Sequence, residues 1–176
     1  MITLFEDDNA LVHLGKEFGI SRWIEVTQQR ITEFGRVTED PDLMHIDPQF
    51  AAVHSPYGGK TFAFGFLTVA LLTRMVNDVV ARPADELSTL NYGFDRLRML
   101  SPVLVDSRIR GRFVLKDLSL RSPTQFRAVY AVTVEVEGEA KPALVADWLS
   151  VTNVANARKP LRAAEPALEG GQRHVQ

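Results

Sequence analysis

The second half of the chain alternates apolar and polar residues, which is the pattern of strands with one buried face. The clearest example is "FRAVYAVTVEVEG", which begins at Phe126. Segments rich in β-branched residues predict strands over 22–26, 87–100, 108–118, 125–138 and 142–154. The later strands are separated by "SPVLVDS", "LRSPTQ" and "EGEAKP", and these breaks predict hairpin connections.

The first half repeats its apolar residues at helical spacing instead. Thr27 is a suitable N-cap for a helix over 28–37, whose apolar positions are Ile31, Phe34 and Val37. Asp47 followed by Pro48 predicts the start of a further short helix that runs toward Val53.

The longest apolar run predicts a helix over 64–81. Its apolar residues cover most of the helix circumference, so this helix is expected to be enclosed. Arg74, Asn77 and Asp78 interrupt the run, which excludes a membrane span. A helix followed by a long meander predicts an α+β fold, in which a curved antiparallel sheet wraps one long central helix.

Composition favours one domain over 1–155 and a mobile C-terminal tail over 156–176, since the tail has few apolar residues. The chain has 176 residues, a net charge of -2 and a pI near 6.1, which gives no indication of a nucleic-acid or membrane partner. It has no cysteine, so disulfides and thiolate chemistry are excluded. The acidic N-terminus does not resemble a signal peptide, and a cytoplasmic protein is therefore expected.

Candidate chemistry gathers in "EDPDLMHIDP", from Glu39 to Pro48. Taken singly, Asp40 and Asp47 precede prolines and read as turn or cap residues, and His45 reads as a structural or surface histidine. Taken together, Asp40 and His45 form a possible acid–base pair that is followed by a glycine-rich loop and an apolar helix. The N–H of Gly65 at the start of that helix can stabilise negative charge that develops on a substrate.

Three arginines of one predicted strand, Arg108, Arg110 and Arg112, alternate and therefore share one face. They read as a solvated face or as a site for ligand phosphates, and we favour the solvated face. Zinc-protease, phosphate-loop, dinucleotide and hydrolase-elbow motifs are missing from the sequence.

The segments "DPDLMHIDPQFAA", "SPYGG" and "GFLTVALL" resemble the hydratase motif of the MaoC-like dehydratases. The later "LNYGFDRLRMLSPVLVDSRIRG" and "VEVEGEAKPALVADWLS" are similar to the NodN-like branch of that family, so the resemblance covers 20–154. It implies a single hot-dog fold, with the central helix wrapped by the sheet, and a homodimer whose sheets join edge to edge.

The resemblance also implies an activity, which is the hydration of trans-2-enoyl-CoA to (R)-3-hydroxyacyl-CoA or the reverse dehydration. The residues carried over are Asp40 and His45 as the catalytic pair and Gly65 as the oxyanion donor. The substrate is an acyl or enoyl thioester, and the family needs neither a metal nor a redox cofactor. Water addition fits such a pair, because a carboxylate and an imidazole can hold one water and transfer its proton.

Two positions depart from the family pattern. Phe64 stands where the family has His, which removes a hydrogen-bond donor, and Asp42 stands where Asn or Gln is usual. Thr73 takes the place of a pocket serine in short-chain hydratases, although its hydroxyl can equally bond back to its own helix.

Two other functions stay open on the same fold. An acyl-CoA thioesterase needs a carboxylate on the central helix, where Asp78 lies late. A non-catalytic acyl-thioester-binding protein is also consistent with the departure at Phe64.

Overall fold

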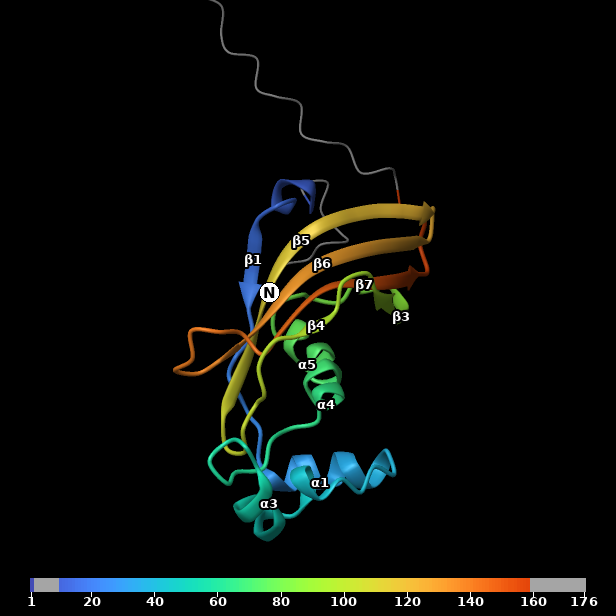
Figure 1. The fold of residues 1–176 in the computed structure, drawn as a ribbon. Coiled ribbons are helices and arrows are strands. Elements are labelled where there is room, and N and C mark those ends of the chain that lie inside the picture. Colours follow the sequence, from blue (N-terminus) through green and yellow to red (C-terminus); the bar gives the residue numbers. More distant parts are fainter. Residues whose placement is uncertain (2–9, 159–176) are drawn as a thin grey trace, which may run out of the picture.

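The protein is built around one antiparallel sheet that curves over a central helix (Figure 1). The structure, a computed structural model, describes residue 1 and residues 10–158. Within these residues the sheet has seven strands in the order β1-β5-β6-β7-β3, and β2 and β4 add to β5 and β7. The strands are β1 (Glu17–Ile20), β2 (Ile24–Glu25), β3 (Glu86–Phe94), β4 (Arg98–Met99), β5 (Arg108–Ser122), β6 (Gln125–Val136) and β7 (Leu144–Val154).

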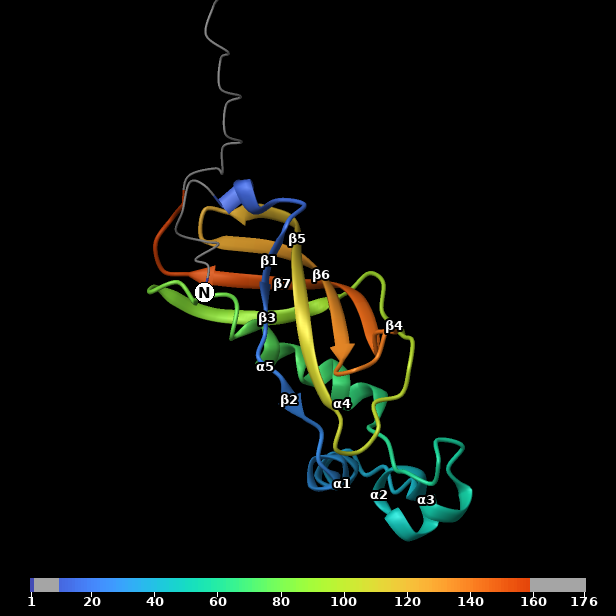
Figure 2. The same ribbon diagram turned by 90° about the vertical axis from the view of Figure 1, so that its left-hand side faces the viewer.

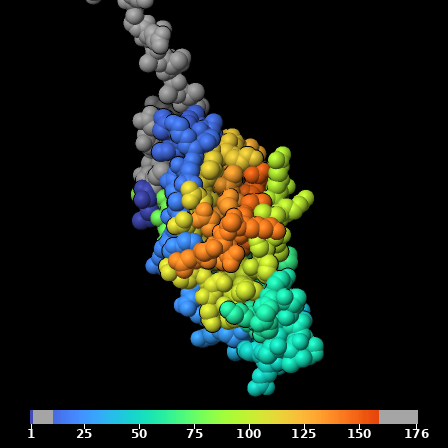
Figure 3. All heavy atoms as spheres, turned by 60° about the vertical axis from the view of Figure 1, so that its left-hand side comes forward, coloured from blue at the N-terminus to red at the C-terminus, as the bar shows by residue number. Residues whose placement is uncertain are grey.

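The helices form two groups, as Figures 1 and 2 show. The concave side of the sheet faces α4 and α5, and the remaining α-helices gather at one end of the molecule. The helices are η1 (Ala10–His13), α1 (Gln28–Val37), α2 (Leu43–Ile46), α3 (Pro48–His54), α4 (Gly65–Ala70) and α5 (Leu72–Val76). Figure 3 shows α2, α3 and the loop that follows, in teal, as a block at that end, beside the yellow residues that come just after 100. The predicted α+β architecture is confirmed.

The long strands pair as the alternation predicted. β5 and β6 form a hairpin closed by Ser122 and Gln125, and β6 continues into β7 by a second hairpin. The prediction of a hairpin at 101–107 is wrong, because β4 pairs with β7 whereas β5 pairs with β6. The segment 101–107 instead crosses from β4, which pairs with β7, to β5. Along this crossing Val103 is buried, and its carbonyl accepts a 2.7 Å hydrogen bond from the Ala63 N–H.

The hydrophobic core fills the space between the sheet and the central helix. Leu72 and Met75 from α5 are fully buried there, and Phe113 and Phe126 meet the core from the sheet. An aromatic cluster continues along the inner face, with Tyr130 between Phe18 and Trp148 at ring-centroid distances of 5.8 and 5.9 Å.

The central helix is shorter and less enclosed than predicted. It is interrupted at Leu71 and ends at Val76, because the following N–H groups bond three residues back and wind the chain more tightly. One face also lies open in the single chain, where Phe66 is 68% exposed. The exposed positions Phe66, Ala70, Thr73 and Asn77 recur at helical spacing.

The predicted caps are confirmed. Thr27 accepts a hydrogen bond from the Arg30 N–H at the start of α1. Asp47 accepts from the Gln49 N–H at 2.8 Å at the start of α3. Only some of the apolar residues that predicted α1 are buried: Ile31 is fully buried, whereas Val37 is 78% exposed.

The arginines of β5 lie on the outer face of the sheet, and carboxylates of neighbouring strands pair with them. Arg110 contacts Glu135 at 2.6 Å, and Arg112 contacts Glu17 at 2.8 Å. Arg108 contacts Glu137 at 3.1 Å. The three guanidinium groups are therefore paired with carboxylates on the outer face of the sheet, as expected for a solvated face rather than a phosphate site. Among the helices of residues 10–158, none has the length and apolar character needed to cross a membrane.

The start of the predicted tail is bound to the domain. Asp85, in the loop before β3, accepts hydrogen bonds from the Asn156 N–H at 3.0 Å and from Arg158 Nη2 at 2.6 Å. Asn156 and Arg158, among the first residues of the predicted tail, therefore contact the domain through Asp85. Residues 159–176 lie outside the described residues.

This contact predicts a pH effect on stability. The hydrogen bonds from Arg158 lower the pKa of Asp85 from 3.8 to about 2. A lowered native pKa stabilises the folded state above pH 3.8, and the contribution is lost as the pH falls toward 2. We expect Asp85→Asn to lower the midpoint of thermal unfolding at neutral pH and to converge with the wild type in acid. Equal midpoints for the wild type and Asp85→Asn at neutral pH as well as in acid would show that the contact does not stabilise the domain.

Candidate active site

The segment that carries Asp40 is a tight turn after α1. Glu39 adopts a left-handed conformation with φ of 56°, and the Asp40 N–H donates to the Gly35 carbonyl at 2.9 Å. The exposed Asp40 side chain accepts from the Asp42 N–H through Oδ1 at 3.3 Å. Asp42 in turn caps α2 by accepting from the Met44 N–H at 2.9 Å. Asp40 Oδ2 has no partner among the described residues.

His45 is fixed more firmly, at the end of α2. Its Nδ1 lies 2.7 Å from the carbonyl oxygen of Phe62. Its ring packs between Phe62 and Phe64, with centroid distances of 4.5 and 4.0 Å. A carbonyl oxygen can only accept, so Nδ1 carries the proton and the neutral ring leaves Nε2 as an acceptor. This arrangement gives His45 one defined orientation and one free nitrogen.

Gln28 connects the elements of this region, although no local sequence pattern indicates this role. Its Nε2 donates to the His45 carbonyl at 2.9 Å, and its Oε1 accepts from the buried Thr61 hydroxyl at 2.5 Å. Gln28 therefore links α1, α2 and the strand-like segment before α4. These partners are distant in sequence, so only the folded chain shows the connection.

His45 and Gly65 line one cavity of about 450 Å³ at the start of α4. Phe62 and Thr68 contribute from the same stretch of chain, and Met99 closes the cavity from β4. Met99 lies so close to Gly65 that a Cβ at that glycine would be 2.1 Å from Met99 Sδ. The absence of a side chain at Gly65 lets Met99 lie directly against the start of the helix.

The predicted site residues are therefore only partly brought together. No hydrogen bond between the Asp40 and His45 side chains is found among residues 10–158, and Asp40 does not line the 450 Å³ cavity. Phe64, which the family resemblance groups with Gly65 at the substrate-binding surface, does not line this cavity. Its ring is buried behind His45 and packs on Phe34 at 5.5 Å, so it supports the imidazole from outside the cavity.

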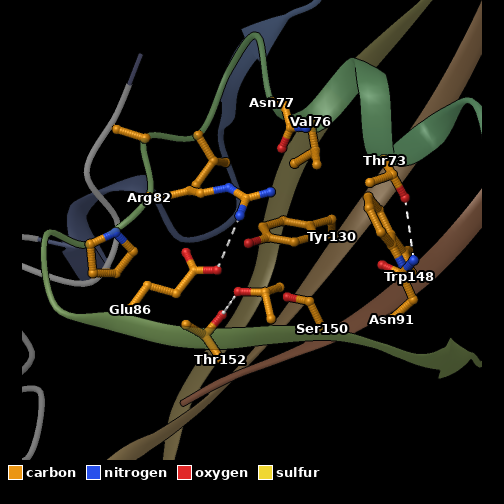
Figure 4. Close-up of a pocket in the computed structure, with 14 residues that line it drawn as sticks. Thr73, Val76, Asn77, Arg82, Glu86, Asn91, Tyr130, Trp148, Ser150 and Thr152 are labelled. Atoms are coloured by element: carbon orange, nitrogen blue, oxygen red, sulfur yellow. Dashed lines mark hydrogen bonds and ion pairs between the residues drawn. The ribbon is translucent and has the colours of Figure 1, made fainter. Parts of the chain in front are cut away.

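Thr73 lies in another cavity, of about 120 Å³, at the far end of the central helix. Figure 4 shows Thr73 beside Asn91, whose Nδ2 donates to the Thr73 hydroxyl at 3.3 Å. Burial raises the pKa of Tyr130 in the wall of this cavity to about 12, and its hydrogen bond with Ser150 opposes that shift. The two cavities share no lining residue, so the structure does not bring Thr73 together with His45.

The geometry fits a known family. A family model described as "MaoC like domain" matches residues 10–139. The chain belongs to this family. The match includes α1 to α5 and the strands up to the end of β6, so it contains Asp40, His45, Gly65 and Thr73.

Named relatives agree with the family and the fold. The chain is 45% identical over 138 residues to "Nodulation protein N" of Rhizobium meliloti, with 78% of this chain and 85% of the relative covered. It is 38% identical over 133 residues to "3-hydroxyacyl-thioester dehydratase Z" of Mycobacterium tuberculosis, with 76% and 86% covered. A solved R-hydratase from Pseudomonas aeruginosa has the same hot-dog fold, with a TM-score of 0.62, 19% identity, and 90% and 92% coverage.

Proposed function

We propose that this protein adds water to trans-2-enoyl thioesters to give (R)-3-hydroxyacyl thioesters, or removes it in the reverse reaction. The observation that carries the proposal is that His45, with Nε2 free, and Gly65, in the first turn of α4, line the same cavity. The relative named as a 3-hydroxyacyl-thioester dehydratase supports the same substrate class.

The mechanism we propose requires the Asp40 carboxylate, which lies outside the cavity in this structure, to share one water with His45 Nε2. A water that donates one hydrogen to Asp40 Oδ2 and the other to His45 Nε2 keeps a lone pair for attack at C3 of the enoyl group. The pair removes one proton from this water and returns a proton to C2, so that only water is consumed. The N–H of Gly65 has no acceptor within its own helix and can stabilise the enolate oxygen. The mechanism uses neither a metal nor a redox cofactor.

One observation bears on the thioesterase alternative. The carboxylate nearest to the central helix, Asp78, follows the end of α5 and forms an ion pair with Arg74 at 2.7 Å. It does not line the 450 Å³ cavity that His45 lines. This placement favours water addition over hydrolysis of the thioester.

Incubation with crotonyl-CoA distinguishes the candidate functions. The proposal predicts loss of the enoyl absorbance and formation of (R)-3-hydroxybutyryl-CoA, with no release of thiol. Release of free coenzyme A without hydration would instead identify a thioesterase. Binding without either reaction would identify a non-catalytic thioester-binding protein.

We also propose a homodimer that pairs through β3. This strand ends the sheet and exposes Leu87, Leu90 and Tyr92 by 70%, 52% and 56%. An unpaired edge of this kind with apolar side chains favours pairing with a second copy. The open face of the central helix, with Phe66 exposed, supports the same arrangement.

Leu90→Lys is expected to convert the dimer to a monomer, because it places a charge on the pairing edge. Light scattering at micromolar concentration measures the change. Val53→Lys is the matched control, since Val53 is 78% exposed on α3 at the other end of the molecule. A wild type that is monomeric and fully active would refute the dimer.

A further inference from the structure

A third cavity, called the outer cavity below, adjoins the one that His45 lines. It has a volume of about 310 Å³, and Tyr57, Ser101 and Pro102 line both cavities. The Tyr57 ring stacks edge-on against Phe62 at 5.0 Å, and Phe62 also contacts His45. The shared residues therefore place the outer cavity directly beside the inner one.

The outer cavity is mostly apolar, and two charged residues also line it. Its walls include Tyr57, Leu104 and Val136, and the Ser107 hydroxyl has no partner among the described residues. Glu139 and Lys141 line it from the connection between β6 and β7. This connection projects on the same side of the molecule as the loop that contains Tyr57 (Figure 1).

Hydrogen bonds fix the backbone that follows Lys141, whereas its exposed side chain is unpaired among the described residues. The neighbouring Pro142 carbonyl accepts from the Ser101 hydroxyl at 2.7 Å, and the Ala143 carbonyl accepts from the Leu100 N–H at 2.7 Å. These bonds attach the connection to the cavity wall. Lys141 forms no ion pair within residues 10–158, whereas Lys116 pairs with Asp147 at 2.8 Å.

We infer that the outer cavity holds the phosphopantetheine arm of the thioester substrate and that Lys141 binds the phosphate at its end. The inference rests on the proposed function, because it assumes that the thioester carbon lies at His45 and Gly65. The arm must then leave by a route that continues from that cavity. Its methyl groups suit the apolar walls, its amides suit the serine hydroxyls, and lysine binds phosphate as a point charge.

Two sources carry this chemistry, coenzyme A and an acyl carrier protein. Both present the same phosphate at the end of the pantetheine arm. The test therefore uses S-butyl thioethers of pantetheine, phosphopantetheine, coenzyme A and a holo-carrier protein, which can be neither hydrated nor hydrolysed. Binding to these probes does not depend on whether the protein is a hydratase.

Calorimetry on Lys141→Ala is expected to show binding of S-butyl-phosphopantetheine weakened about two- to fivefold, as for an exposed charge pair. Binding of S-butyl-pantetheine should not change, since it has no phosphate. Added salt should weaken the wild type more than the variant. Glu139→Gln should bind the phosphate probe more tightly, because it removes a like-charged neighbour.

Lys16→Ala is the matched control. Lys16 is exposed, forms no ion pair among the described residues, and precedes β1 away from both cavities. Equal losses for pantetheine and phosphopantetheine in Lys141→Ala, or no loss for either, would overturn the inference. The ratio of affinities for the coenzyme A and carrier-protein probes then identifies the source. A phosphate-dependent loss in a protein that hydrates no enoyl thioester would uphold the site and reject the hydratase.

Discussion

Replacement of His45 by Ala is expected to lower kcat on crotonyl-CoA by about two orders of magnitude or more, as for a positioned acid–base group. The ring is the only group in the 450 Å³ cavity that the structure fixes with a free basic nitrogen, since Nδ1 is committed to the Phe62 carbonyl. Loss of enoyl absorbance measures the rate. Thermal unfolding of the same variant checks that the packing of Phe62 and Phe64 survives.

The chain provides a matched control for this variant. His54 also bonds a phenylalanine carbonyl through Nδ1, at 3.0 Å from Phe50, and its ring stacks on Phe50 at 4.2 Å. It is exposed on α3 and lines none of the three cavities. His54→Ala should therefore keep wild-type kcat. A similar loss in both variants would attribute the effect to folding and would count against a catalytic His45.

Leu72→Ala is expected to lower the free energy of unfolding by about 2–5 kcal/mol, the range for a buried leucine replaced by alanine. Leu72 is 1% exposed on α5, between the helix and the sheet. The change removes apolar contacts and leaves a cavity that the curved sheet cannot collapse to fill. Chemical denaturation measures the difference.

Val53→Ala is the control for this stability measurement. Val53 is 78% exposed on α3, away from the proposed dimer edge, so its truncation should change the unfolding free energy only slightly. A loss below about 0.5 kcal/mol in Leu72→Ala would mean that the central helix is not enclosed, and the packing of the hot-dog fold would be wrong.

The sequence predicted the parts of the fold that depend on local pattern. The alternation of β5 to β7 and the caps at Thr27 and Asp47 are decided by residues close together in the chain, and the structure confirms them. Strand β1 was missed because four residues that contain Gly19 carry too little alternation to stand out. The crossing at 101–107 was misread, because turn residues do not reveal which strands they connect.

In the candidate site, the sequence likewise predicted only the residues that belong to a local motif. The sequence indicated His45 and Gly65, which the structure brings into one cavity. It did not indicate Gln28 or Met99, because their contacts cross the chain and have no local pattern. Nor did it indicate that Phe64 packs behind the imidazole, where a side chain without a polar group is shielded from water.

Asp40 is the residue on which the catalytic account depends most, because its side chain is exposed and, among the described residues, bonds only the Asp42 N–H. Asp40→Asn keeps the shape and that hydrogen bond but removes the basic carboxylate. Asp47→Asn serves as the control, because Asn caps a helix about as well as Asp.

The most direct test is kcat for crotonyl-CoA hydration by the wild type, Asp40→Asn, His45→Ala and the double variant, measured side by side. The account predicts hydration by the wild type and a loss of about two orders of magnitude or more in each single variant. The double variant should be little worse, because residues that act as one unit are strongly non-additive. Wild-type protein that hydrates no enoyl thioester, or Asp40→Asn with wild-type kcat, would contradict it.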